Sequence, residues 1–217
     1  MNAVRAVLFD LDGTFADTAP DLAGALNRLR AERGLAPVPL ELARPHTSAG
    51  ARGLLEIGFG VTPDSEGYEA MRERFLDLYE EDICVDTRLF AGIPELLSEI
   101  EARGLRWGIV TNKAKRFTEP LMRKLALHRR ASCVVSGDST PHIKPHPDSL
   151  LHAAALLSLP PPACLYLGDD LRDVQAAHAA GMGAIAAAWG YLGEGGDPHG
   201  WGADAVIAHP LDALKAL

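Results

Sequence analysis

In the stretch AVLFDLDGT, residues 6–14, an apolar run stops abruptly at acidic residues. Four apolar residues followed at once by Asp10 indicate a buried strand of a parallel sheet. Ligands of open α/β sheets bind beyond the carboxyl ends of the strands. We therefore expect Asp10 and Asp12 at the ligand-binding edge of such a sheet.

The two carboxylates at this strand end predict two different chemical roles. Both would be costly to bury unless a cation neutralises one and a proton neutralises the other. Asp10 would stay ionised, ligate Mg²⁺ and attack phosphorus as a nucleophile. Asp12 would protonate the leaving oxygen and then deprotonate the attacking water. The alternative is an ordinary acidic turn after a strand.

Outward from this stretch, short apolar runs alternate with helical patterns. The helical pattern at residues 93–100 has Pro94 near its start and Gly104 beyond its end. The apolar runs lie at residues 107–110, 133–136, 164–167, 184–187 and 205–208. This alternation predicts an α/β fold in which helices cover both faces of a parallel sheet.

One segment, residues 16–83, breaks the alternation. Its two apolar patterns have helical spacing, and it contains no convincing strand. The patterns are Leu22, Ala25, Leu26, Leu29 and Tyr68, Met71, Phe75, Leu78. We interpret the segment as an inserted α-helical cap with hinges near Asp17 and residues 85–90. The core domain would then consist of residues 1–15 and 84–217.

A second acidic cluster, GDDLRD at residues 168–173, also follows an apolar strand directly. Carboxylates gathered at one strand end are suited to a hard cation. Asp169 is the best candidate for a direct ligand, and Asp173, one helical turn later, could orient metal-bound water. Asp170 is either a ligand or the cap of the following helix. Helix capping alone is the alternative for the whole cluster.

Two further positions are candidates for phosphate binding. Thr111 ends an apolar run and can donate a hydrogen bond to a phosphoryl oxygen, although an ordinary turn at Thr111 and Asn112 is the alternative. Lys144 precedes Pro145, which restricts it to extended backbone and presents it from a stiff loop. Its ammonium could balance both Asp10 and a bound phosphoryl group. The alternative is a solvated surface lysine.

These four motifs occur in the chain order found in the haloacid dehalogenase superfamily, and the chain resembles its phosphoglycolate phosphatase group. The resemblance implies a Rossmann-like core with a small helical cap. It also implies Mg²⁺ held by the Asp10 side chain, the Asp12 backbone carbonyl and Asp169. The phosphoryl group would be bound by three residues, namely Thr111, Asn112 and Lys144.

A narrower likeness is to N-acetylmuramic acid 6-phosphate phosphatases of cell-wall recycling. It is carried by SAGAR at residues 48–52, FTEP at 117–120 and WGAD at 201–204. Arg52 in the cap could pair with a substrate carboxylate, which both muramic acid and phosphoglycolate carry. A solvent-facing helix arginine is the alternative. We interpret Lys113 as a surface residue, and His142 and His146 as loop residues rather than metal ligands.

Alternative activities within the same superfamily remain open. A sugar phosphomutase also keeps both aspartates. A dehalogenase needs no acid at Asp12, and a phosphonate hydrolase needs a cap lysine, which residues 16–82 lack. A catalytically inactive regulator should have lost one of the central residues, and all are present. We therefore expect a phosphoric monoester hydrolase.

Composition limits the partners and the compartment. The formal net charge of −8 argues against nucleic acids and anionic membranes, since both need a basic face. No apolar run approaches the roughly 20 residues of a membrane span, and residues 1–10 do not resemble a signal peptide. The three cysteines fit free thiols. We expect a cytoplasmic monomer or homodimer whose partner is a small phosphorylated metabolite.

Overall fold

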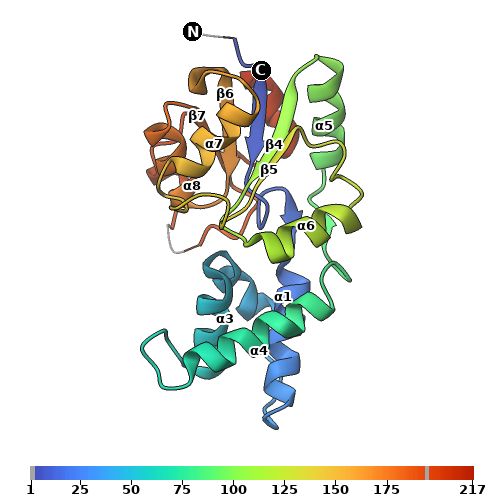
Figure 1. Ribbon diagram of the computed structural model, residues 1–217, viewed down its shortest axis with the longest axis vertical. Coiled ribbons are helices and arrows are strands. Elements are labelled where there is room, and N and C mark those ends of the chain that lie inside the picture. The colour runs from blue at the N-terminus through green and yellow to red at the C-terminus, as the bar shows by residue number, and fades with distance from the viewer. Residues whose placement is uncertain (1–2, 194–195) are drawn as a thin grey trace.

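The computed structural model describes residues 3–193 and 196–217, and its centre is a six-stranded sheet (Figure 1). The strands are β1 (Ala6–Phe9), β4 (Arg106–Val110), β5 (Cys133–Val135), β6 (Cys164–Gly168), β7 (Gly183–Ala187) and β8 (Ala205–Ile207). Their order is β5-β4-β1-β6-β7-β8, and all neighbours are parallel. The predicted α/β fold is therefore confirmed, and each apolar run overlaps a strand.

Side-chain alternation along β1 divides the core between the two faces of the sheet. Val7 and Phe9 pack in one cluster with the helices at residues 93–102 and 115–124, whereas Ala6 and Leu8 pack in the other with those at 148–156 and 171–179. The helices of this part are α5 (Ile93–Ala102), α6 (Lys115–Lys124), α7 (Asp148–Leu156) and α8 (Leu171–Ala179), with the short helices η2 (Pro161–Ala163), η3 (Pro198–Gly200) and η4 (Pro210–Ala216). Burial on both faces explains why the strands are apolar runs rather than alternating patterns.

A helical segment lies beyond the carboxyl end of the sheet (Figure 1). Its helices are α1 (Ala19–Ala31), α2 (Leu40–Ala43), η1 (Arg44–Ala49), α3 (Gly50–Phe59) and α4 (Tyr68–Glu81). The short antiparallel strands β2 (Ala16–Asp17) and β3 (Arg88–Leu89) flank it. We propose that this ribbon is the hinge between a core of residues 1–15 and 84–217 and a cap of residues 16–83.

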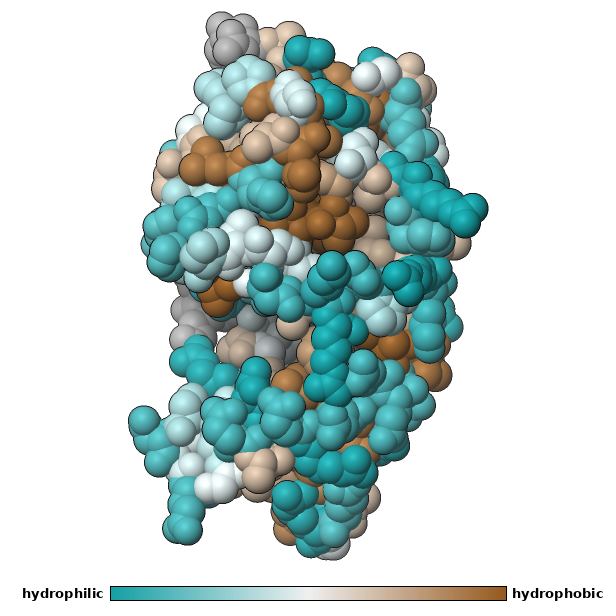
Figure 2. Space-filling model, in the orientation of Figure 1, coloured by the Kyte–Doolittle hydropathy of each residue, from teal (hydrophilic) through white to brown (hydrophobic). Residues whose placement is uncertain are grey.

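The surface of the two halves differs in polarity. Hydrophilic residues cover most of the visible face of the helical segment in Figure 2 (lower half), whereas apolar residues gather on the sheet-bearing half. The three cysteines are free thiols. Within residues 3–193 and 196–217, the helices are too short or too polar to cross a bilayer. Met1 and Asn2 lie outside the described residues.

Replacing Phe15 should test whether the loop after β1 depends on aromatic packing. Its buried ring lies 5.5 Å from that of Phe9 and 5.6 Å from that of Trp107. We expect Phe15→Ala to lower the free energy of unfolding in urea by about 3–5 kcal/mol. Leu42→Ala, at a side chain that is 58% exposed, is the control and should change it by at most about 0.5 kcal/mol. A loss below about 1 kcal/mol for Phe15→Ala would contradict this account.

Candidate active site

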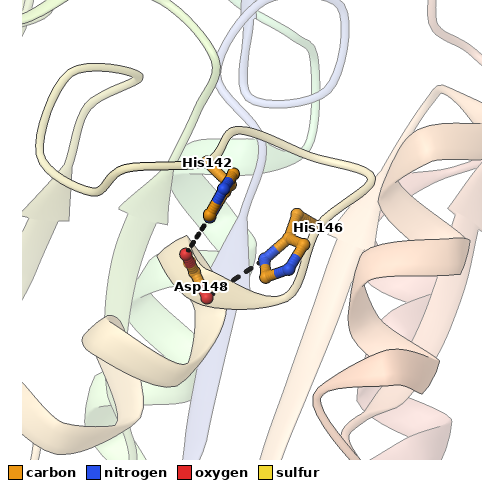
Figure 3. Close-up of side chains that lie close together, drawn as sticks. All are labelled: His142, His146 and Asp148. Carbon is orange, nitrogen blue, oxygen red and sulfur yellow. Dashed lines mark hydrogen bonds and ion pairs between the residues drawn. The ribbon is translucent and has the colours of Figure 1, made fainter.

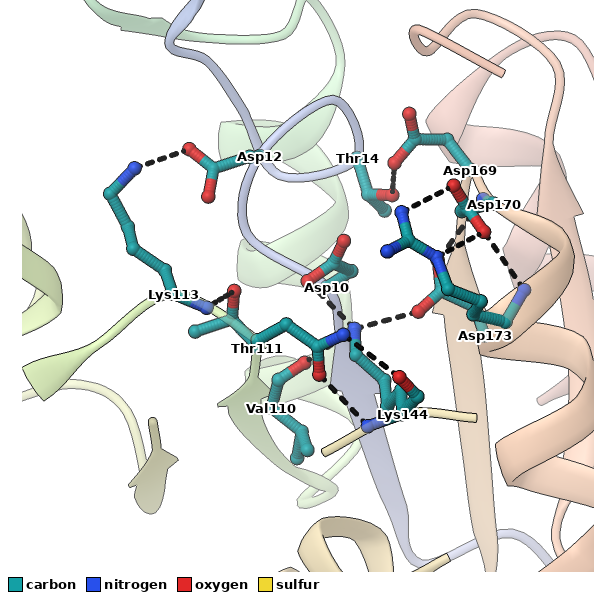
Figure 4. A network of polar contacts seen from close by, with 12 residues as sticks. Asp10, Asp12, Thr14, Val110, Thr111, Lys113, Lys144, Asp169, Asp170 and Asp173 are labelled. Carbon is teal, nitrogen blue, oxygen red and sulfur yellow. Dashed lines mark hydrogen bonds and ion pairs between the residues drawn. The ribbon is translucent and has the colours of Figure 1, made fainter. Parts of the chain in front are cut away.

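The candidate active site lies where the chain leaves β1, β4 and β6, three neighbouring strands. Because parallel strands point the same way, their carboxyl ends bring distant residues together at one edge. Asp10 follows β1, and Asp169 and Asp173 follow β6. Each of these three side chains offers an oxygen within 4.8 Å of the others. Figure 4 shows Asp10 and Asp173 on either side of the Lys144 ammonium and Asp169 beside Thr14.

The Lys144 ammonium is the cationic centre of this cluster. Its side chain is 2% exposed, and Nζ lies 2.9 Å from Asp10 Oδ1 and 2.6 Å from Asp173 Oδ1. Nζ also contacts the Tyr166 hydroxyl at 2.7 Å and the Val110 carbonyl at 3.2 Å. Burial opposes the charge of Lys144, but Asp10 and Asp173 outweigh it and raise its pKa. The alternative of a solvated surface lysine is therefore wrong.

Negative charge exceeds positive charge at this site. Three carboxylates face one ammonium, so full ionisation leaves two negative charges in a buried space. Burial, and then the nearby Asp173 and Asp12, raise the pKa of Asp10 to about 7 against the opposing effect of Lys144. Burial and the neighbouring Asp10 and Asp173 also raise the pKa of Asp169 well above its usual range.

The donor set fits one divalent hard cation. Asp10 Oδ1 is buried, and among the described residues its polar contact is the Lys144 ammonium at 2.9 Å, which leaves a lone pair for a metal ion. Mg²⁺ prefers oxygen ligands and is commonly bound by one or two carboxylates. One such ion would cancel the two excess charges. The cluster therefore has the charge, the donor atoms and an unused lone pair that a Mg²⁺ site requires.

Asp169 is held in place by contacts that its own motif does not contain. Thr14 Oγ1 donates to Asp169 Oδ1 at 2.6 Å, and the Tyr191 N–H donates to Oδ2 at 2.7 Å. A Cβ at Gly13 (φ +89°) or at Gly190 would lie 2.2 Å from the Asp169 side chain. The sequence analysis missed Thr14, Gly190 and Tyr191 in this role. The Gly13-Thr14 part of the motif was the only available signal.

Asp170 and Asp173 have separate tasks. Asp170 caps α8, because its Oδ1 accepts from the Arg172 N–H at 2.9 Å, and Asp173 Oδ2 accepts in return from the Asp170 N–H. The Asp170 carboxylate also binds the Arg172 guanidinium and Ser48 Oγ of η1. Burial acts to raise the pKa of Asp170, but these hydrogen bonds outweigh it and lower the pKa. The helix cap expected as one possibility for Asp170 is therefore present, and a contact of Asp170 with the metal stays a prediction.

Asp12 points away from Asp10 and toward Lys113 (Figure 4). Its Oδ1 accepts hydrogen bonds from Lys113 Nζ at 2.9 Å and from Thr18 Oγ1. Our interpretation of Lys113 as a surface residue was wrong: its side chain is 8% exposed, and its ammonium lies 4.6 Å from the centre of the Tyr79 ring. Burial disfavours the charge, but Asp12 and Tyr79 raise the Lys113 pKa overall. A salt bridge and an aromatic ring thus explain why a lysine is buried here.

Thr111 and Asn112, which follow β4, make different hydrogen bonds. Thr111 is buried at the end of β4, and its hydroxyl accepts a hydrogen bond from the Lys113 N–H. The Asn112 side chain forms two hydrogen bonds with the Lys144 backbone, donating to the carbonyl at 3.0 Å and accepting from the N–H at 2.9 Å. The Asn112 side chain therefore fixes the position of Lys144.

A cavity of about 460 Å³ joins the carboxylate cluster to the helical segment. The core contributes Asp10, Asp12, Thr111 and Lys144 to its wall. The helical segment contributes Arg52, Tyr68 and Arg72, and α6 contributes Arg116. The predicted specificity residue Arg52 thus lies in the wall of the same cavity as the predicted nucleophile.

Comparison with known proteins agrees with this geometry. The chain matches the model of the haloacid dehalogenase-like hydrolase family over residues 7–187. The chain belongs to this family. The predicted family and the predicted hydrolase class are therefore confirmed.

Similar members of the haloacid dehalogenase-like hydrolases have two kinds of name. A protein of Pseudomonas putida strain KT2440 named N-acetylmuramic acid 6-phosphate phosphatase is 42% identical, covering 99% of this chain and 96% of its own. A phosphoglycolate phosphatase of Xanthomonas campestris pv. campestris strain 8004 is 40% identical, covering 97% and 95%. The crystal structure of a predicted phosphoglycolate phosphatase from Haemophilus somnus 129PT superposes with a TM-score of 0.87 at 26% identity, covering 100% and 99%.

Mg²⁺ should raise the thermal stability of this hydrolase, and Asp169→Asn should abolish the increase. At a Mg²⁺ concentration of 100 times the Kd, an ion that binds only the folded state raises the free energy of unfolding by about 2.7 kcal/mol. This corresponds to roughly 5 to 11 °C in Tm for a chain of this size. The variant carries one less buried negative charge and loses a ligand. Differential scanning calorimetry with and without Mg²⁺ measures both effects.

Asp64→Asn, at an exposed carboxylate of the helical segment, is the matched control and should keep the full response. An equal increase in Asp169→Asn would show that the ion binds elsewhere.

Proposed function

We propose that this chain is a Mg²⁺-dependent phosphatase that hydrolyses N-acetylmuramic acid 6-phosphate through an aspartyl phosphate on Asp10. The observation that carries the proposal is the cavity of about 460 Å³ that runs from the carboxylate cluster to Arg52. Its volume falls within the range of pockets for drug-sized ligands, about 300–1,000 Å³. A two-carbon phosphoglycolate would leave most of it unfilled, whereas a substituted sugar phosphate would use it.

In the first step, an Asp10 carboxylate oxygen attacks phosphorus and the bond from phosphorus to the sugar oxygen breaks. Asp12 donates its proton to the departing alkoxide, so the sugar leaves as a neutral alcohol. In the second step, water attacks the aspartyl phosphate and gives its proton to Asp12. The bond from phosphorus to Asp10 breaks, and inorganic phosphate leaves.

Asp12 must change its contacts before it can act as the acid. Its Oδ1 is engaged by the Lys113 ammonium and by the Thr18 hydroxyl. A carboxylate in this ion pair cannot at the same time donate a proton to the leaving oxygen. We infer that substrate binding turns Asp12 from Lys113 toward the scissile bond. Thr18 directly precedes α1, so the same motion involves the base of the helical segment.

The remaining core residues supply charge and position. The Asp10 side chain, Asp169 and the Asp12 backbone carbonyl would hold Mg²⁺. When bound, the ion would neutralise the charge that develops on the phosphoryl oxygens. Asp173 would orient water bound to the metal ion. Lys144 and the Thr111 hydroxyl would bind the phosphoryl group, while Asn112 holds the Lys144 backbone. Preorganised charges of this kind give phosphoryl transfer most of its acceleration.

A positive charge in the cap, that of Arg52, also supports a muramic acid derivative as the substrate. Arg52 would pair with the lactyl carboxylate of the substrate. This pairing would distinguish the substrate from a sugar phosphate that has no carboxylate. The relatives at 42% identity have the name that fits this assignment, and those at 40% are named for phosphoglycolate, which also bears a carboxylate. Phosphoglycolate is therefore the competing substrate. A phosphomutase would need a second sugar hydroxyl in place of water as the acceptor.

Phosphate release should separate the two substrates. We expect kcat/KM with Mg²⁺ to be at least about 100-fold higher for N-acetylmuramic acid 6-phosphate than for 2-phosphoglycolate, because more binding energy is available in the cavity. Asp10→Asn should abolish both rates, which excludes a contaminating phosphatase. A preference for phosphoglycolate would overturn the substrate assignment, and retained activity in Asp10→Asn would overturn the nucleophile.

The role of Arg52 is testable with a substrate that lacks only the carboxylate. We expect Arg52→Ala to lower kcat/KM for N-acetylmuramic acid 6-phosphate by roughly 10- to 150-fold, the equivalent of a charged hydrogen bond of about 1.5–3 kcal/mol. The rate on N-acetylglucosamine 6-phosphate should not change. Arg123→Ala, at an exposed arginine of α6, is the control. Equal losses on both sugars would mean that Arg52 supports the cap rather than reads the carboxylate.

A further inference from the structure

A second group of possible metal ligands lies outside the cavity, in the loop before α7 (Figure 3). His142 and His146 both turn Nδ1 toward the carboxylate of Asp148, the first residue of α7. The distances are 2.8 Å from His142 Nδ1 to Oδ2 and 3.0 Å from His146 Nδ1 to Oδ1. The proposed phosphatase reaction uses none of these three side chains.

The geometry is close to that of a small coordination shell. One ligand atom from each residue lies within 4.8 Å of the other two, and the imidazole centroids are 4.5 Å apart. Ligands about 2.0 Å from a tetrahedral ion are about 3.3 Å from one another. The two nitrogen–oxygen distances are already near that value, so small rotations of the side chains would admit an ion.

The loop that carries these residues is stiff. Pro141, Pro145 and Pro147 fix the backbone around both histidines. The His146 N–H also donates to the Ile143 carbonyl at 2.9 Å, and Thr140 Oγ1 donates to the His142 carbonyl at 3.0 Å. Little backbone freedom would therefore be lost when an ion joins the side chains.

The donor types indicate which ion would bind. Neutral imidazole with one carboxylate suits Zn²⁺, Ni²⁺ or Cu²⁺, whereas Mg²⁺ prefers oxygen. The side chains are 61%, 49% and 30% exposed, which leaves coordination positions open to water.

Although the sequence led us to expect loop residues rather than metal ligands at His142 and His146, we propose that they form with Asp148 a second cation site that takes a transition-metal ion of the Zn²⁺ class. The two imidazoles lie on either side of Lys144 in the sequence. An ion bound to both would link the two ends of the loop that presents Lys144 to the carboxylate cluster. The site differs from the cluster at Asp10 in its donors and in its exposure to solvent. It does not depend on the identity of the substrate.

Calorimetric titration of the full chain with Zn²⁺ tests the proposal. The protein must carry no affinity tag, and Mg²⁺ is kept in large excess so that the carboxylate cluster is occupied. We expect one Zn²⁺ per chain. His142→Ala and His146→Ala should each weaken binding by at least the roughly 10- to 100-fold that loss of a supporting partner costs at metal sites. Circular dichroism should be unchanged, because both side chains are at the surface.

His178→Ala is the matched control, since His178 pairs with Asp204 at 3.4 Å and belongs to no group of three possible metal ligands within residues 3–193 and 196–217. Its Zn²⁺ affinity should equal that of the wild type. The Cu²⁺-loaded wild type should also show nitrogen splitting in its electron paramagnetic resonance spectrum, and this splitting should be lost in the His142→Ala/His146→Ala double variant. Absence of stoichiometric Zn²⁺ binding, or equal binding in the double variant, would overturn the proposal.

Discussion

The carboxylates of Asp10, Asp169 and Asp173 lie within 4.8 Å of one another beside a single ammonium, that of Lys144. Asp169 and Asp173 are buried and the Asp10 side chain is only 14% exposed, so water screens them poorly, and Lys144 offsets only one of their charges. Such an arrangement is costly unless a cation completes it. The pKa values of Asp10 and Asp169 are raised because burial and mutual repulsion penalise their ionised forms. We infer that this local loss of stability is offset when the proposed Mg²⁺ site is filled.

The surrounding fold holds these charges in place from several distant parts of the chain. Tyr191 gives its N–H to Asp169, while its hydroxyl accepts from the N–H groups of Thr18 and Ala19 and donates to Asp17. It thereby satisfies the start of α1, where Thr18 makes no side-chain cap. One residue thus connects a predicted metal ligand with the proposed hinge of the helical segment.

The sequence was sufficient for features whose cause is local. Apolar runs that end in acidic residues predicted the strands and the positions of Asp10 and Asp169, because strand burial and chain direction are properties of short segments. The sequence was insufficient to predict the burial of Lys113, because its partner Asp12 is 101 positions away. The sequence was likewise insufficient for the contact between the Asn112 amide and the Lys144 backbone, 32 positions away, while phosphate binding by Asn112 stays a prediction. Contacts of this range leave no periodic pattern in the sequence.

The residues proposed for chemistry and those proposed for specificity come from different parts of the fold but line one cavity. The carboxylates, Thr111 and Lys144 all project from the sheet edge, whereas Arg52 and Tyr68 reach the cavity from the helical segment. The two groups meet through a few polar contacts, among them Ser48 with Asp170 and Thr18 with Asp12. Because Asp12 shares its Oδ1 between Thr18 of the helical segment and Lys113 of the core, movement of that segment alters the surroundings of the proposed acid. The two proposals together imply that substrate binding by the helical segment would be coupled to proton transfer by Asp12.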